Sequence, residues 1–217
     1  SAALGGPYNA LLRSPDMARR CFDFLDYLRF RTSVSKRLNE FAILIQARIA
    51  NAQYEWWAHE RIARKAGLAD AVMRDLQMAQ RPSQMQADER LVYNYCVQLS
   101  LNHRVPDALW QQAVTEMGEQ AVIDLTVLSG TYVMVSMLLN ATQVGIPGGG
   151  AEPLEVLDPV EIRQQVQRRQ LADHDVGFCR RSATTVEQHQ HRRDQAERGD
   201  DHEHDEHKEG HAAEAHH

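Results

Sequence analysis

The sequence predicts an all-α protein. Its long apolar segments repeat at spacings of three and four residues, as on one face of a helix, rather than at the spacing of two that marks a half-buried strand. Capping residues, Gly and Pro stand between these segments, where they end one helix and begin the next. Hydrophobic residues make up 43% of the 217 residues, enough to build the core of a domain.

The predicted helices follow one another with local start and stop signals. Ser14 and Pro15 begin a helix that runs through Leu28, and Ser33 or Ser35 caps the next one. Further starts and stops, including glycines at 67 and 118, predict helices over about 36–50, 53–66, 69–78, 87–102, 107–117 and from 119 to about 140. The helix over 36–50 carries apolar side chains on two faces, so we expect neighbours on both sides of it.

The composition of the chain changes near Pro153. Up to that residue 15 Lys and Arg balance 15 Asp and Glu, whereas from Leu154 onward there are 9 against 15. The last 64 residues hold a single aromatic residue and nine of the eleven histidines. A packed core is not expected from this composition, nor an apolar face on residues 160–170. The sequence therefore predicts a helical domain over 1–153 and a low-complexity, disordered tail over 154–217.

Charge and cysteine patterns exclude several classes of function. The neutral body has no basic stripe that would neutralise phosphates, so we expect no nucleic-acid partner. Residues 122–139 approach the length of a membrane span, but five polar residues interrupt them and favour a buried helix, with no membrane partner. Cys21, Cys96 and Cys179 lack paired spacing, which predicts no disulfide framework and a reducing, cytoplasmic setting.

The stretch QYEWWAHERIARKAG, residues 53–67, holds the candidate catalytic residues. Glu55 and His59 are four residues apart and share the face that should point inward. A carboxylate beside an imidazole raises its pKa and fixes its tautomer, as a general acid or base requires. Glu40 lies on an apolar stripe of the preceding helix and should join them. The alternatives are a contact that only satisfies two buried polar groups, or a metal site, although a second histidine completing H-E-x-x-H is missing.

The segment 200–217 is acidic and rich in histidine. One interpretation of these closely spaced histidines is that they bind Ni²⁺, Zn²⁺ or Cu²⁺ loosely. The simpler interpretation is a solvated extension. We therefore predict no metal and no cofactor for the folded domain, and the weak metal candidates in the tail are His202, His204, His207 and His211.

Four stretches carry a resemblance to a known family. They are GGPYNALLRSP at 5–15, YLRFR at 27–31, NEFAILIQARIANAQYEWWAHERIARKAGL at 39–68 and VIDLTVLSGTYVMVSMLLNATQVGIP at 122–147. In this order they resemble the carboxymuconolactone decarboxylase family, within the alkylhydroperoxidase-like (AhpD-like) superfamily. The resemblance implies an all-α bundle around a helix hairpin, assembled as trimers or hexamers with active sites near subunit contacts.

The peroxidase branch of that superfamily uses a glutamate, a C-x-x-C pair and a histidine. The resemblance places the glutamate on Glu40 and the histidine on His59, but Ala52 and Glu55 stand where the two cysteines would be. A dithiol peroxidase needs both thiols, so we expect no such activity, even though a peroxiredoxin label belongs to the superfamily. The Glu-x-x-x-His helix is similar to the decarboxylase branch.

The resemblance implies a lyase that acts on a small carboxylated lactone, or a related acid from aromatic catabolism. His59, kept protonated by Glu55, is expected to give the proton that replaces the lost carboxylate, and Glu40 to orient it or to handle a substrate proton. Arg29 or Arg31 is expected to bind a substrate carboxylate, with solvated surface arginines as the alternative. The alternatives are a non-catalytic helical assembly unit or small-ligand binder on the same scaffold, and a peroxidase that works by a non-dithiol route.

Overall fold

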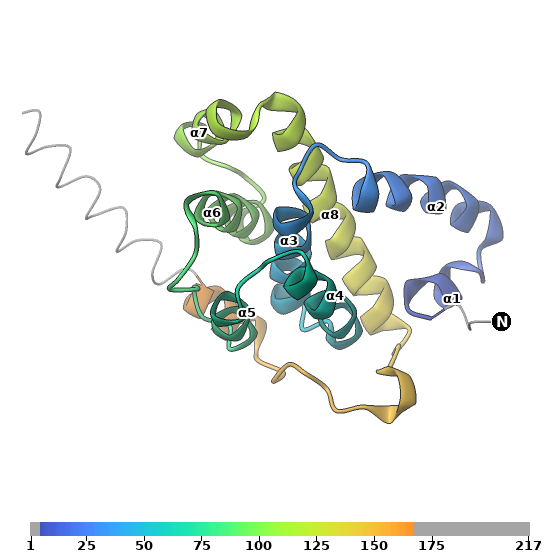
Figure 1. The fold of residues 1–217 in the computed structure, drawn as a ribbon. Coiled ribbons are helices and arrows are strands. Elements are labelled where there is room, and N and C mark those ends of the chain that lie inside the picture. Colours follow the sequence, from blue (N-terminus) through green and yellow to red (C-terminus); the bar gives the residue numbers. More distant parts are fainter. Residues whose placement is uncertain (1–4, 167–217) are drawn as a thin grey trace, which may run out of the picture. The chain divides into compact units, whose positions relative to one another are not determined.

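The computed structural model describes residues 5–166, and every regular element among them is helical (Figure 1). This confirms the predicted all-α class. The helices are α1 (Pro7–Leu11), α2 (Pro15–Phe30), α3 (Lys36–Ile49), α4 (Gln53–Lys65), α5 (Asp70–Gln77), α6 (Ala87–Asn102), α7 (Asp107–Met117) and α8 (Glu119–Ala141). A 3₁₀ turn, η1 (Pro147–Gly149), and a short helix over 159–166 follow them.

The local signals place these helices well. Ser14 precedes α2, whose first residue is a proline, and Ser35 precedes α3, although neither serine side chain makes a capping hydrogen bond. The five-residue α1 was not predicted. It starts after Gly6, which has a φ of 66° and touches the Tyr54 ring so closely that an added Cβ would lie 2.5 Å from it.

Helix α3 is the central element of the bundle. It packs against α4, α6 and α8 (Figure 1), and every residue from 38 to 48 is buried. This explains why two faces of its sequence are apolar, since each has a neighbouring helix. The same burial means that any charged side chain on α3 must find a partner inside the protein.

Helix α8 runs past both α3 and the N-terminal helices. Its length and composition alone would let it cross a membrane, but 56% of its most apolar window is buried inside the protein. Leu125 and Leu128 pack in the main core, and Val135 and Leu139 pack in a smaller cluster with Leu25 of α2. Residues from both ends of α8 thus join the N-terminal helices to the central bundle.

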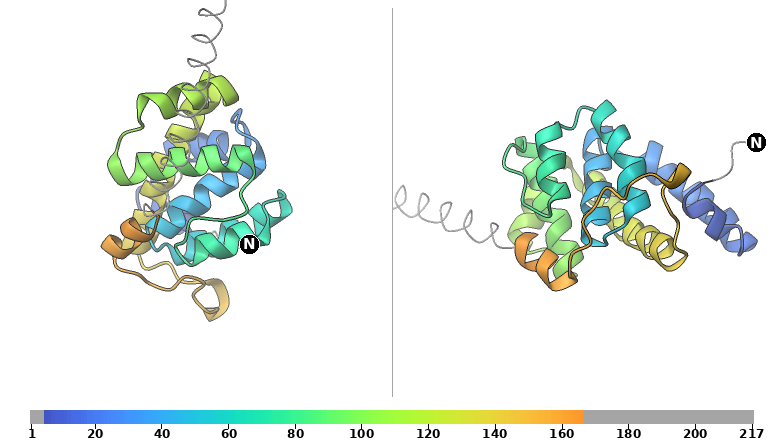
Figure 2. Two further views of the ribbon diagram at one scale, coloured as in Figure 1. Left: turned by 90° about the vertical axis from the view of Figure 1, so that its left-hand side faces the viewer. Right: turned by 90° about the horizontal axis from the view of Figure 1, so that it is seen from below.

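The folded part continues beyond the predicted boundary at Pro153. Leu154, Ile162 and Val166 are buried in the main core, and residues 154–166 run back along the bundle (Figure 2). The prediction that this region lacks an apolar face was wrong for 160–166, because Ile162 and Val166 lie one helical turn apart. The rest of the predicted tail, with its four candidate metal ligands, lies outside the described residues.

Candidate active site

The short turn between α3 and α4 brings Glu40 and His59 together. The two residues face each other from adjacent helices, and His59 Nδ1 lies 2.6 Å from Glu40 Oε2. Lys36, one turn before Glu40 on α3, places its Nζ 2.6 Å from Oε1 of the same carboxyl group. The Glu40 side chain is fully buried, and its contacts with His59 and Lys36 compensate for the hydration that it loses.

The environment sets the charge of this pair. Burial by itself would raise the pKa of Glu40, but the hydrogen bond and charge of His59 and then those of Lys36 outweigh it and hold the pKa below its ordinary value. Burial lowers the pKa of His59, and the charges of Arg29 and Lys36 act in the same direction against the pull of Glu40. At neutral pH we therefore assign a carboxylate to Glu40 and a neutral imidazole to His59, with Nδ1–H donating to Glu40.

Glu55 lies on the same inner face of α4 but in different surroundings. Ser136 of α8 donates a hydrogen bond to its Oε2, while Oε1 is buried without a hydrogen-bond partner. Burial raises the pKa of Glu55 to about 8, against the smaller effect of Ser136. The carboxyl group is therefore mostly protonated at pH 7. The structure differs from the prediction that Glu55 keeps His59 protonated, because the imidazole pairs with Glu40 and Glu55 is bonded to Ser136 instead.

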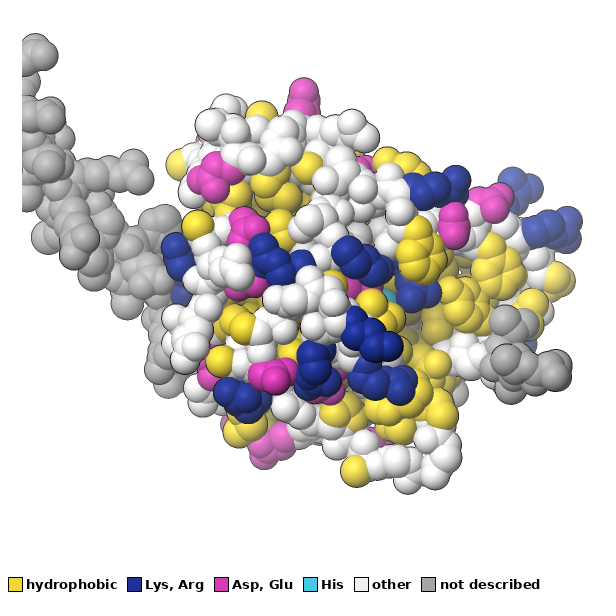
Figure 3. Space-filling view, in the orientation of Figure 1, with side chains coloured by type: hydrophobic (Ala, Val, Ile, Leu, Met, Phe, Trp, Pro, Cys, Tyr) yellow, Lys and Arg dark blue, Asp and Glu magenta, His cyan; other side chains and the backbone are white. Residues whose placement is uncertain are grey.

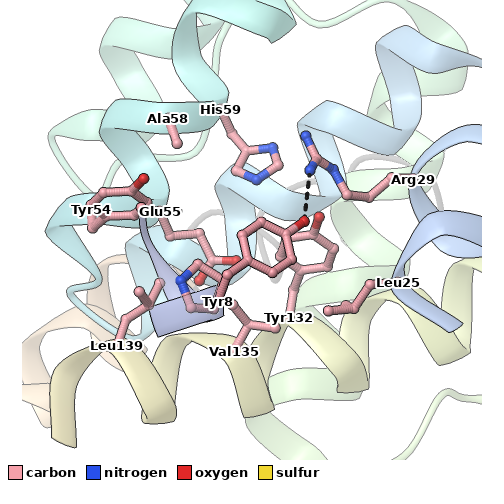
Figure 4. Close-up of a pocket in the computed structure, with 12 residues that line it drawn as sticks. Tyr8, Leu25, Arg29, Tyr54, Glu55, Ala58, His59, Tyr132, Val135 and Leu139 are labelled. Carbon is pink, nitrogen blue, oxygen red and sulfur yellow. Dashed lines mark hydrogen bonds between the residues drawn. The ribbon is translucent and has the colours of Figure 1, made fainter. Parts of the chain in front are cut away.

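Glu55 and His59 both line a cavity of about 190 Å³ between α4, α8 and the N-terminal helices (Figure 4). Glu40 stays behind His59 and is not among the lining residues. Besides Gly5 and Pro7, the lining consists of Tyr8, Leu25, Arg29, Tyr54, Glu55, Ala58, His59, Tyr132, Val135 and Leu139.

Arg29 supplies a positive charge at one end of this cavity. Its Nη1 donates a hydrogen bond of 3.4 Å to the Tyr8 hydroxyl, and in Figure 4 the Tyr132 hydroxyl lies at the same end. Tyr132 also packs edge-on against the His59 ring, with centroids 5.3 Å apart. Burial raises the pKa of Tyr132, so its hydroxyl keeps its proton and can donate it in a hydrogen bond.

The structure separates the two arginines of the YLRFR stretch. Arg29 lines the cavity, whereas Arg31 forms an ion pair of 2.9 Å with Asp26 on the surface, where both side chains are more than half exposed. Of the two arginines predicted to bind a substrate carboxylate, only Arg29 lines the cavity. Figure 3 shows further Lys and Arg side chains over α4, beside an apolar area over the N-terminal helices.

No family model, curated protein or solved structure matches this chain. The family resemblance therefore stays a prediction from the sequence. What the site does has to be argued from its own geometry.

Besides Lys36 on α3, sequence reasoning missed three residues of the site that belong to other helices: Tyr8, Tyr132 and Ser136. They come from α1 and α8, far from the α3–α4 hairpin in sequence, so no local spacing connects them to His59. Ser136 did leave a signal, since it is one of the polar residues that interrupt the apolar sequence of α8. A buried hydroxyl there needs a partner, and Glu55 is that partner.

Residues 5–166 give little support to metal chemistry or to thiol chemistry at this site. No group of three or more His, Cys, Asp and Glu residues in this range could hold a metal ion. Cys96 is buried, and burial raises the pKa of its thiol to about 12 despite a contact with Ser129, while Cys21 is half-buried on α2. Neither cysteine lines the cavity. What the arrangement can do is move protons between a neutral acid, a neutral base and a bound anion.

Proposed function

We propose that this protein is a lyase of the carboxymuconolactone decarboxylase type. It removes carbon dioxide from a small carboxylated lactone, or a related β,γ-unsaturated acid of aromatic catabolism, in the cytoplasm. The observation that carries this proposal is Glu55: a buried carboxyl group that faces a small cavity, keeps its proton near neutral pH and has one oxygen without a partner. An acid in this state is suited to protonate a carbon atom of a bound substrate.

The reaction needs one proton at one carbon. The bond between the substrate and its carboxylate breaks, carbon dioxide leaves, and the electron pair moves through the double bond to the γ-carbon. Glu55 gives its proton to that carbon and becomes a carboxylate, which regains a proton from water. The buried, partly apolar position of Glu55 disfavours its carboxylate form. Transfer of its proton therefore becomes favourable only when negative charge forms on the substrate.

The other residues position and balance this step. Arg29, with the hydroxyls of Tyr8 and Tyr132 beside it, holds the negatively charged end of the substrate. Glu40 fixes the tautomer of His59, so that Nε2 carries the lone pair. In this assignment Glu55 is the acid and His59 the hydrogen-bond acceptor or base, whereas the sequence predicted His59 as the proton donor, kept protonated by Glu55.

The proposal includes a homo-oligomer, with a trimer or hexamer as the expected size. Helix α8 is apolar on every side, yet Ile123, Met134 and Met137 are 47%, 41% and 65% exposed. A helix of this kind is normally covered all round, and a second copy of the chain would cover it. Light scattering on the purified chain measures the size.

An absorbance assay separates this proposal from its rivals. The chain is incubated with carboxymuconolactone and a panel of related unsaturated acids, and both the ultraviolet spectrum and released carbon dioxide are followed. Turnover that disappears in Glu55→Gln supports the lyase. Binding without turnover across the panel would favour a small-ligand binder, and consumption of a hydroperoxide would favour the non-dithiol peroxidase.

A further inference from the structure

The lone pair on Nε2 of His59 has no bond to make in the decarboxylation, which takes its proton from Glu55. We propose that the cavity also moves a carbon–carbon double bond within an unsaturated lactone that carries a carboxylate, with His59 as the base and Glu55 as the acid. This isomerase activity shares its cavity and its acid with the proposed lyase, but it needs no loss of carbon dioxide.

The first argument is the placement of the two side chains. Glu55 and His59 point into the cavity from the same face of α4 (Figure 4). Residues four apart on a helix have Cβ atoms about 5–6 Å apart, so a ring that lies against this face meets both side chains. The two carbons that lose and gain a proton in such an isomerisation are separated by one ring atom. An acid and a base at this spacing can therefore serve one bound ring.

The second argument is how the two side chains are held. His59 uses Nδ1 for Glu40, the one hydrogen-bond partner of its ring within residues 5–166, so the lone pair lies on Nε2. Glu55 accepts from Ser136 through Oε2, and Oε1 has no partner in the same range. Burial lowers the pKa of His59 and raises that of Glu55 to about 8. Near pH 7 the imidazole can accept a proton while the carboxyl group still holds one.

The atoms and electrons balance with these two groups alone. In a five-membered lactone whose double bond lies beside the carbonyl, the C–H bond at the carbon next to the ring oxygen breaks, and its proton goes to Nε2 of His59. The electron pair of that bond forms the new double bond. The pair of the old double bond takes the proton of Glu55 at the carbon next to the carbonyl. One proton then passes from the imidazolium to the Glu55 carboxylate through water, which restores both groups.

The walls of the cavity suit this class of substrate. Arg29, bonded to the Tyr8 hydroxyl, offers a charge for the carboxylate arm, and Leu25 and Val135 offer an apolar wall for the ring. A cavity of about 150 Å³ accepts one benzene ring, and this one measures about 190 Å³.

Solvent can reach the cavity beside Ala58, as the return of the proton requires. Ala58 also lines a neighbouring hollow on α4, whose other lining residues are exposed or half-buried: Arg61, Ile62, Arg64 and Lys65.

The test is hydrogen–deuterium exchange with the full chain. The probe is (5-oxo-2,5-dihydrofuran-2-yl)acetate, an α,β-unsaturated lactone with a carboxylate arm, incubated in D₂O near pH 7 and followed by proton NMR. The proton signal at ring carbon 2 should disappear, and the β,γ-unsaturated isomer should form with deuterium at ring carbon 4. Both rates should exceed those in buffer by at least about 10²-fold. Rates equal to those in buffer would overturn the inference.

Two matched variants assign the base. His59→Asn keeps a side-chain nitrogen near the position of Nδ1, where it can still donate to Glu40, but has no atom in place of Nε2. Exchange at ring carbon 2 should fall by about 10²- to 10⁴-fold. His103, exposed at the end of α6, has a φ of 55° that asparagine tolerates, so His103→Asn should exchange like the parent. Equal rates in the two variants would contradict the assignment.

Glu55→Gln separates the two proton transfers and does not depend on the folding of His59→Asn. It has no acidic proton, so formation of the β,γ isomer should fall more than exchange at ring carbon 2, which depends on His59. Isomer formation at the parent rate would remove Glu55 as the acid of this reaction and overturn the inference.

The lyase proposal is tested separately, by released carbon dioxide. If the double bond moves and no acid is decarboxylated, the inference stands and the lyase proposal falls. If an acid is decarboxylated but the probe neither exchanges nor isomerises, the lyase proposal stands and the inference falls.

Discussion

The two ends of α3 each bury a charged side chain completely, yet they do so in different ways. Glu40, in its N-terminal half, contacts two groups that themselves carry or accept protons, His59 and Lys36, and the imidazole opens onto a cavity. Arg48, in its last turn, donates to the main-chain carbonyls of Glu155 and Gln77 and to the Asn51 side chain. Arg48 is not among the residues that line the cavity.

The difference shows which buried charge is tied to chemistry. The described hydrogen bonds of Arg48 go to neutral oxygen atoms, and the only described charge that acts on it is that of Glu155, so Arg48 serves to hold residues 155–157 against the bundle. The imidazole that pairs with Glu40 lines the cavity, so the protonation state of His59 responds to a charge that binds there. Changes near the cavity should therefore alter turnover more than stability, and changes near Arg48 the reverse.

The largest effect is expected from Glu55→Gln, at the cavity end. Glutamine keeps an oxygen that accepts from Ser136 but has no acidic proton, so kcat should fall by about 10²- to 10⁴-fold, the usual range for a general acid. The melting temperature should not decrease at pH 7. Steady-state turnover and a circular dichroism melt measure the two quantities.

Glu60→Gln is the matched control for this variant. Glu60 lies on the other side of α4, where it pairs with Arg64 near the surface. Its replacement should leave kcat within a factor of two or so, as for most surface changes. Turnover of Glu55→Gln within tenfold of the parent would remove Glu55 as the proton donor.

The next effect belongs to the other end of α3. Arg48→Met deprives the carbonyls of Glu155 and Gln77 of their donor, which should lower the free energy of unfolding by about 2–4 kcal/mol. Urea denaturation measures the change, with Arg74→Met, exposed on α5, as the control. The folded fraction should keep its kcat. A loss of turnover with unchanged stability would reverse the contrast between the two ends.

A smaller effect tests how firmly the segment held by Arg48 packs. Ile162 is 1% exposed in the main core, and Val160 on the same short helix is 60% exposed. Ile162→Ala should lower the free energy of unfolding by about 2 kcal/mol, since it removes buried methyl groups, whereas Val160→Ala should change it by less than about 0.5 kcal/mol. Equal values in denaturant titrations would show that residues 159–166 do not pack as described.

The helices of the bundle could be predicted because their signals are local. Gly67 and Gly118, the proline after Ser14 and the apolar spacing identify starts and ends within a few residues. The same periodicity placed Glu55 and His59 on one inner face and Glu40 on a buried one. These are properties of single helices, so neighbours in space are not needed to see them.

The partners inside the site could not be predicted in this way. Whether His59 meets Glu40 or Glu55 depends on how α3 and α4 are rotated against each other, and Glu55 meets Ser136 only because α8 packs beside α4. Glu55 was predicted to raise the pKa of His59 because it was assumed to be the ionised partner of the imidazole, whereas in the structure Glu40 has this effect. The segment 154–166 was missed because its average composition is polar, while its packing depends on a few apolar residues, above all Ile162 and Val166.

The most gradual expected effect is the pH dependence that Glu55 gives to stability, because it is spread over several pH units. Its pKa is about 8 in the folded protein and near 4.5 when unfolded. Between these values the unfolded chain releases the proton and the folded protein keeps it, so stability from this group is full below about pH 4.5 and declines as pH rises toward 8. The decline is at most about 1.4 kcal/mol per pH unit.

Glu55→Gln has no proton to lose, so its free energy of unfolding, relative to the parent, should rise from pH 5 to pH 8 and then level off. Urea titrations of both proteins at several pH values measure this difference, in which the titration of all other groups cancels to first order. A difference that is flat across this range would show that Glu55 is ionised in the folded protein, and would remove the contrast between a neutral acid at the cavity and an ionised Glu40 behind it.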